Sequence, residues 1–129
     1  MNSYSYIDIK EREMKECNHE AEHEYAAKRA RELMPSEEEV ARVAASFKTI
    51  SEASRLKILF ALRHGEMCVY HIVEAVGGTQ SAVSHQLRLM KASGIVKSRR
   101  DGQNIVYSLA DEHVLAVLEL ACAHLKCTI

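Results

Sequence analysis

The 129-residue sequence has no tryptophan, two phenylalanines, one proline and five glycines, and it has no long apolar run. A membrane helix needs about 18 to 20 apolar residues in succession, and a signal peptide begins with basic and then apolar residues, whereas this N-terminus is acidic. We therefore expect a cytoplasmic protein without membrane contact. A chain of this length forms one small domain with an appended segment, which excludes a multidomain enzyme.

Cysteine and histidine are better represented, with four and seven copies. The cysteines are Cys17, Cys68, Cys122 and Cys127. In the reducing cytoplasm such thiols are usually free or bind metal, and rarely form disulfides. The composition therefore directs attention to metal ligands.

The formal net charge of −1 is the sum of two unlike parts. Residues 1–39 carry six Lys or Arg and eleven Asp or Glu, whereas residues 40–129 carry eleven against seven. Residues 79–107 alone carry five basic side chains and one acidic side chain. Such a basic stretch is either a solvated surface or a nucleic-acid interface, and the local pattern has to decide between them.

Helical patterns cover most of the chain. Pro35 separates an N-terminal stretch of good helix formers from a capping-box pattern that begins at Ser36. Ser51 or Ser54 can cap the next helix, and Thr79 or Ser81 can cap a later one. The predicted helices span residues 11–34, 36–50, 55–64, 69–76, 79–92 and 112–126.

Two of these helices are short and are separated by Gly77 and Gly78, the pattern of a helix-turn-helix. Two strand-like runs follow, joined by Asp101 and Gly102, which favour a β-hairpin. The order predicts a mainly α fold with a β-hairpin wing, a winged helix-turn-helix. We divide the chain into an acidic helical segment with candidate metal ligands, residues 1–35, and a DNA-binding and dimerisation domain, residues 36–129.

In a winged helix-turn-helix the second short helix enters the major groove, and the wing reaches neighbouring phosphates or the minor groove. Gln80 and Arg88 suit adenine and guanine edges, while serine and threonine hydroxyls more often bind phosphate. The basic stretch coincides with this helix and the wing, which favours double-stranded DNA as a partner over a solvated surface. The candidate DNA contacts are Thr79, Gln80, Ser81, Ser84, His85, Arg88, Lys97, Arg99, Arg100 and Gln103.

The segments Glu66–Val69 and Ser81–Arg88 resemble the ArsR/SmtB family of metal-sensing repressors. The resemblance continues through Gly94–Val96, Arg100–Gly102 and Val106–His113, and it covers residues 40–127. It implies a homodimer that binds operator DNA and leaves it when an effector binds.

The last helix carries the most plausible effector ligands, Asp111, His113, His124 and Cys127. Eleven residues separate the two histidines, which places both on nearly the same face but about 16 Å apart. One ion cannot reach both ends of one helix, but two antiparallel copies would form two equivalent sites shared between subunits. The family's C-terminal site is similar, although Cys127 replaces its final His or Glu, and a thiolate favours zinc and cadmium over harder ions.

Each of these residues also has a structural interpretation. Asp111 is a good N-cap, His113 can be an exposed first-turn residue, and Cys127 lies near the end of the chain. Their joint spacing nevertheless favours a metal site. Cys122 falls on the apolar stripe of the helix and is expected in the core or in the dimer interface.

A second candidate site comprises Cys17, His19, His23, Cys68 and His71. Cys68 and His71 are three residues apart at a helix start and can converge on one ion. The family joins N-terminal ligands to a cysteine at the position of Cys68, but Cys17, His19 and His23 fit a solvated acidic helix equally well. Tyr70 stands where arsenic- and lead-sensing relatives have a second cysteine, which disfavours an arsenic site.

The sequence therefore predicts a metal-responsive repressor with zinc or cadmium as effector and with cobalt and nickel as further candidates. The alternative is a repressor of the same fold that senses oxidants or persulfides through cysteine. A metal buffer would not need the basic wing. A zinc enzyme would need an open coordination position and a general base, so we expect no enzyme activity.

Overall fold

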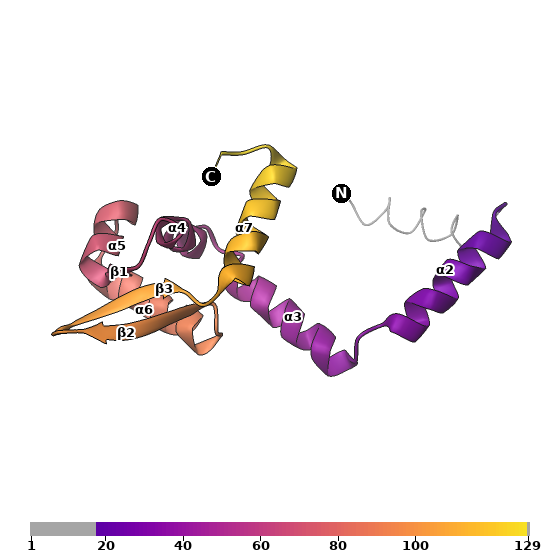
Figure 1. Cartoon of the computed structure of the whole chain (residues 1–129), viewed down its shortest axis with the longest axis horizontal. Helices are drawn as coiled ribbons and strands as arrows, with labels where there is room; N and C mark the ends of the chain where they lie inside the picture. The colour runs from indigo at the N-terminus through magenta and orange to yellow at the C-terminus, as the bar shows by residue number, and fades with distance from the viewer. Residues whose placement is uncertain (1–17, 129) are drawn as a thin grey trace, which may run out of the picture. The chain divides into compact units, whose positions relative to one another are not determined.

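Residues 18–128 are described by a computed structural model (Figure 1). The chain divides into two compact units, Met1–Glu37 and Glu38–Ile129. Among the described residues, no helix has the length and apolar character needed to cross a bilayer. The domain boundary after residue 35 stays a prediction.

The first unit contains α2, Glu20–Leu33. Residues 11–17 of the predicted N-terminal helix lie outside the described residues, and residues 18–19 form a turn. His19 has φ −116° and ψ 45°, so α2 begins only at Glu20. All residues of α2 are exposed.

The second unit contains the predicted winged helix-turn-helix, with one short strand that the sequence did not indicate. Its helices are α3 (Glu37–Ile50), α4 (Ala53–Leu62), α5 (Val69–Val76), α6 (Gln80–Ala92) and α7 (Glu112–Leu125). Its strands are β1 (Met67–Cys68), β2 (Val96–Asp101) and β3 (Asn104–Leu109). The predicted glycine turn is present, since Gly77 and Gly78 have φ 83° and 84°, which a residue with a side chain rarely adopts.

The three strands form an antiparallel sheet in the order β1-β3-β2. The wing is the β2–β3 hairpin, in which Asp101 pairs with Asn104 around the predicted turn. Val96 at the start of the wing pairs with Leu109, and both side chains pack in or against the core. The hairpin is therefore anchored at its base, while its tip is exposed.

One core joins α4, α5, α6, the sheet and α7. Leu59, Ile72, Leu87 and Met90 have no exposed surface, and Leu118 brings α7 into the same cluster. Burial of these side chains fixes which face of α6 points inward. The opposite face of α6 is left for function.

The predicted bounds of α4 and the predicted end of α7 were wrong, since α4 ends at Leu62 and not at His64. Neither Ser51 nor Ser54 caps α4, since Glu52 occupies the N-cap position and the Ser54 hydroxyl donates to the Glu52 carboxylate at 2.6 Å. Helix α7 ends one residue early, because Lys126 adopts the left-handed conformation with φ 57°.

Candidate nucleic-acid interface and metal ligands

The outward face of α6 carries the predicted DNA contacts. The Thr79 hydroxyl accepts a hydrogen bond from the Ala82 N–H at 3.1 Å and thereby caps the helix, so Thr79 and not Ser81 is the cap of the two that the sequence allowed. Because Val83, Leu87 and Met90 face the core, the exposed positions of α6 point away from it. Ser84 is half-buried, and the exposed candidates are Thr79, Gln80, Ser81, His85 and Arg88.

The wing presents its basic side chains at the surface. Lys97, Arg99, Arg100 and Gln103 are all exposed, and the Arg100 guanidinium donates to the Gly102 carbonyl at the turn. Figure 1 shows the hairpin projecting beyond α6. Helix α6 and the wing therefore offer the polar and basic groups that a groove and its phosphates require.

One wing arginine already has a partner inside the protein. The Arg99 guanidinium donates two hydrogen bonds to the Glu66 carboxylate, with a distance of 3.0 Å from Nε to Oε2. This contact holds the pKa of Glu66 below its usual value. Glu66 lies directly before β1, so the ion pair ties the wing to the loop that leads to Cys68. The sequence did not indicate this pair, because its members are far apart in the chain.

Replacing Glu66 by glutamine is expected to release Arg99 for phosphate contact. The plot of log binding constant against log salt concentration should then become steeper by about one unit, the effect of one added phosphate contact. Glu112→Gln makes the same change of charge on α7 and is the control. Equal slopes for Glu66→Gln and Glu112→Gln would show that Arg99 does not reach DNA.

A polar network joins the middle of α6 to α4 and to the residues just before α4. The Gln86 amide oxygen accepts from Arg55 Nε at 2.6 Å, and its NH₂ group donates to Glu52. Arg55 also donates to the Thr49 carbonyl and forms an ion pair with Glu52. The Ser54 hydroxyl and Arg55 hold the pKa of Glu52 below its usual value. Gln86 is thus a structural residue within the segment that resembles the family.

The two ends of α7 carry the predicted metal ligands. At its start, Asp111 Oδ1 accepts from the backbone N–H groups of His113 and Val114 at 2.9 and 3.2 Å. The hydrogen bonds from Val114 and His113 lower the pKa of Asp111. The His113 ring lies 3.4 Å from Asp111 Oδ1, and its side chain is 84% exposed.

His124 and Cys127 lie at the other end of the helix, and a single chain does not bring them to Asp111 and His113. In residues 18–128, no three His, Cys, Asp or Glu side chains are grouped closely enough to hold one ion. Asp111 and His113 come together, as do Cys68 and His71. A complete tetrahedral site therefore requires ligands from a second chain or from outside the described residues.

Substitution can separate the helix-capping role of Asp111 from its predicted role as a metal ligand. Asn and Ser cap helices as well as Asp, whereas Ala does not. Asp111→Ala is therefore expected to lower the melting temperature by a few degrees, and Asp111→Asn to leave it unchanged. Both variants should bind Zn²⁺ more weakly if the carboxylate is a ligand. Calorimetric melting and zinc titration of both variants would check this, and full zinc affinity in Asp111→Asn would exclude Asp111 as a ligand.

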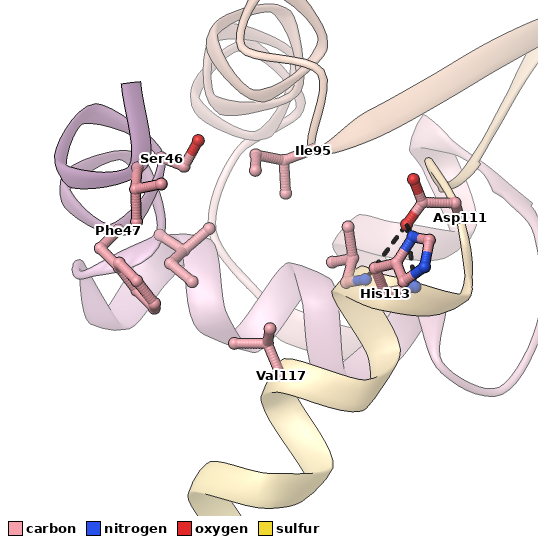
Figure 2. Close-up of a pocket in the computed structure, with 9 residues that line it drawn as sticks. Ser46, Phe47, Ile95, Asp111, His113 and Val117 are labelled. Atoms are coloured by element: carbon pink, nitrogen blue, oxygen red, sulfur yellow. Dashed lines mark hydrogen bonds and ion pairs between the residues drawn. The ribbon is translucent and has the colours of Figure 1, made fainter. Parts of the chain in front are cut away.

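An apolar pocket of about 290 Å³ lies between α3 and α7. Figure 2 shows Phe47 on one side, Val117 on α7, and Asp111 with His113 at the start of α7. Exposed apolar side chains continue from this pocket along both helices. They are Val40, Val43 and Phe47 on α3, and Val117, Leu120 and Leu125 on α7.

Cys68 and His71 meet at the start of α5. The Cys68 Sγ lies 3.1 Å from His71 Nδ1, and the backbone N–H and ring of His71 lower the pKa of the thiol. Both residues line a pocket of about 430 Å³ that Glu66 and Arg99 also line. Of the N-terminal candidates, Cys17 lies outside the described residues, and the rings of His19 and His23 are 6.0 Å apart.

Cys122 and Cys127 also lie together, which the sequence did not predict. Cys122 is buried, as expected, and Cys127 is exposed. The Cys127 thiol donates to the Cys122 carbonyl at 3.5 Å, and the nearby Cys127 side chain together with burial raises the pKa of Cys122. The left-handed Lys126 causes this contact, because it folds the chain back over the last turn of α7.

Comparison with known proteins gives a consistent assignment. The profile of the arsR family of bacterial regulatory proteins matches residues 53–98. The transcriptional repressor SmtB homolog of Synechocystis is 34% identical over 114 residues, which cover 88% of this chain and 86% of that protein. The chain belongs to the ArsR family.

Other relatives are similar to this chain in sequence and in structure. The regulator NmtR of Mycobacterium tuberculosis is 46% identical over 84 residues, covering 65% of this chain and 70% of NmtR. The solution structure of apo-NmtR has a TM-score of 0.63, with 71% of this chain and 77% of that chain covered at 42% identity. A homodimeric winged helix-turn-helix domain of a regulator from Mycobacterium bovis has a TM-score of 0.66 at 30% identity, covering 73% and 90% of the two chains.

These ArsR-family relatives are transcriptional regulators and not enzymes. The predicted winged helix-turn-helix and the predicted family are confirmed. The profile match includes α4, the helix-turn-helix and the start of the wing, but ends before α7. Family membership therefore supports the DNA-binding elements and leaves the ligands of α7 to be tested.

Proposed function

We propose that this chain is a homodimeric transcriptional repressor that binds operator DNA and leaves it when Zn²⁺ or Cd²⁺ binds between its subunits. The observation that carries the proposal is the placement of candidate ligands at the two opposite ends of α7. An effector site of this kind lies outside the helix-turn-helix and can act on DNA binding only through the arrangement of the dimer.

DNA binding is assigned to α6 and the wing. Arg88 and Gln80 would contact base edges, and Lys97 and Arg100 of the wing would contact phosphates. The exposure of these side chains and the rigid attachment of α6 to the core support this assignment. The Synechocystis relative is named a transcriptional repressor, which supports repression over activation.

A second copy of the chain is the proposed partner for the apolar faces of α3 and α7. Phe47 is 54% exposed and Leu120 is 70% exposed, which is unfavourable for side chains of this kind in water. The homodimeric relative from Mycobacterium bovis has the same fold. Dimerisation would cover these faces and place two α7 helices against each other.

Antiparallel packing of two α7 helices would complete the metal site. Asp111 and His113 of one subunit would then face His124 and Cys127 of the other, giving two equivalent tetrahedral sites. A set of one carboxylate, two imidazoles and one thiolate suits Zn²⁺ and Cd²⁺, and Co²⁺ and Ni²⁺ are weaker candidates. Because Asp111 Oδ1 caps the helix, Oδ2 is the oxygen that an ion would take.

Cys68 and His71 are the proposed basis of a second metal site. Their side chains are already in contact, and the lowered pKa of Cys68 favours the thiolate that a metal ion requires. The ligands that would complete this site are those predicted on the N-terminal segment, Cys17, His19 and His23.

Saturating Zn²⁺ is expected to weaken the binding of the protein to operator DNA by about 5- to 150-fold, the range of typical allosteric coupling. Metal ligation would fix the rings of His113 and His124, and their second nitrogens could then bond to neighbouring groups across the interface. A fluorescently labelled operator, selected in vitro from random DNA, would be titrated with protein with and without Zn²⁺. His124→Ala should bind DNA normally and lose the response.

Undiminished DNA affinity at saturating Zn²⁺ would contradict the proposal. A response that persists without His113 and His124 would instead favour a cysteine-based sensor of oxidants or persulfides. The lowered pKa of the Cys68 thiol is the observation that supports this second candidate, because the thiolate is the reactive form. Cys68→Ser would then abolish the response.

A further inference from the structure

The C-terminal end of α7 forms a closed turn that brings two cysteines together. The Cys127 N–H donates to the Cys122 carbonyl at 2.9 Å, and the Lys126 N–H donates to the Ala123 carbonyl at 3.2 Å. With Lys126 in the left-handed conformation, these two bonds define a Schellman motif. This motif places the residue after the left-handed position over the residue five positions earlier, and here both residues are cysteines.

The side chains of Cys122 and Cys127 also lie close together. The Cys127 thiol donates to the Cys122 carbonyl oxygen at 3.5 Å. Cys122 is 5% exposed and packs on the inner side of α7, while Cys127 is exposed. The pair thus combines an accessible thiol with a buried neighbour, the arrangement of an attacking and a resolving cysteine.

We propose that Cys122 and Cys127 form a reversible disulfide within one chain when the protein meets a hydroperoxide. The Cys127 thiolate attacks one peroxide oxygen, the O–O bond breaks, and Cys127 becomes a sulfenic acid while the alkoxide leaves and takes a proton. The Cys122 sulfur, after losing its proton, then attacks the Cys127 sulfur. Hydroxide leaves, takes that proton and becomes water, so two thiols are oxidised and one hydroperoxide is reduced.

The disulfide would also regulate the proposed metal site. Oxidation removes the Cys127 thiolate from the ligand set, so the oxidised protein should bind Zn²⁺ more weakly and remain on DNA. This consequence rests on the proposed function, whereas formation of the disulfide does not. Transient disulfides of this kind occur in cytoplasmic redox sensors.

The position of a lysine in the sequence allows a direct test of the disulfide between Cys122 and Cys127. Lys126 lies between the two cysteines, so trypsin separates a peptide that contains Cys122 from a peptide that begins at Cys127. The full-length protein would be treated with hydrogen peroxide, its free thiols blocked with N-ethylmaleimide, and the digest analysed by mass spectrometry without reduction. The two peptides should remain joined, and a reductant should separate them.

Variants at Lys126 provide a matched control for the turn. Glycine adopts the left-handed conformation readily, and a β-branched residue resists it. In a Cys17→Ser, Cys68→Ser background, Lys126→Gly should lose two free thiols to peroxide as fast as the parent, and Lys126→Val should lose them several-fold more slowly. Equal rates would overturn the role assigned to the turn.

Three results would overturn the disulfide itself. They are labelling of both cysteines by N-ethylmaleimide after peroxide, Cys127 recovered as a sulfinic acid with Cys122 free, and, in the Cys17→Ser, Cys68→Ser background, a covalent dimer on a non-reducing gel. Zinc titration of the reduced and oxidised forms separates the two proposals. If the reduced protein binds no Zn²⁺ but the joined peptides are found, the metal site fails and the disulfide is supported.

Discussion

Replacing Leu87 by alanine is expected to lower the free energy of unfolding by about 2 to 5 kcal/mol, the range for a leucine truncated in a packed core. Leu87 has no exposed surface and lies in the core cluster with residues of α4, α5 and α7. The free energy of unfolding of a small domain is only about 5 to 15 kcal/mol, so this substitution would remove much of the stability. Urea unfolding followed by circular dichroism measures the change.

Two substitutions on the same helix serve as controls. Leu87→Met keeps the volume of the side chain and should cost less than about 1.5 kcal/mol. Leu89→Ala removes the same atoms from a side chain that is 38% exposed and should also cost less than Leu87→Ala. If Leu87→Ala were no more destabilising than Leu89→Ala, the assignment of the inward face of α6 would be wrong.

The structural features that were predicted correctly from the sequence are specified by residues that are adjacent in the chain. The Thr79 cap, the turn at Gly77 and Gly78, and the hairpin turn after Asp101 are each specified within a few positions. Their signals are conformational, since a hydroxyl caps a helix and glycine accepts positive φ wherever it occurs. The order of these local signals was sufficient to predict the winged helix-turn-helix.

The features that sequence missed depend on partners distant in the chain. Strand β1 has two residues and exists because Met67 and Cys68 pair with Tyr107 and Val106 of β3. The pairs Glu66–Arg99 and Arg55–Gln86 also join segments about thirty residues apart. Nothing near these residues in the sequence indicates the contact, so only the folded chain reveals it.

Within one chain, only the proximity of Asp111 and His113 can be compared with the predicted metal ligands of α7. Asp111 and His113 lie together because both belong to the first turn of α7, and spacing alone predicts this. In the proposed site, His124 and Cys127 would come from a second chain, and no pattern within one chain can place that second chain. The contact between Cys122 and Cys127 was missed because Lys126, unlike glycine, gives no signal for a left-handed turn.

Among the candidate DNA contacts, Arg88 is the residue whose substitution is expected to weaken DNA binding most. Replacing Arg88 by alanine is expected to weaken binding to the selected operator by about 5- to 150-fold, which corresponds to loss of about 1 to 3 kcal/mol from a base contact. Arg88 is exposed, so the free energy of unfolding should stay within about 0.5 kcal/mol of the wild type. Fluorescence anisotropy at constant salt measures the affinity.

Comparison of operator and random DNA distinguishes a base contact from a phosphate contact. A bidentate contact to guanine is lost in both Arg88→Ala and Arg88→Lys, since an ammonium group cannot replace the two parallel guanidinium donors. Arg100→Ala, on the wing, should instead weaken binding to both DNAs alike and reduce the salt slope by about one unit. If Arg88→Ala also weakened both DNAs equally, Arg88 would be a phosphate contact, and base recognition would belong to Gln80 and its neighbours at the start of α6.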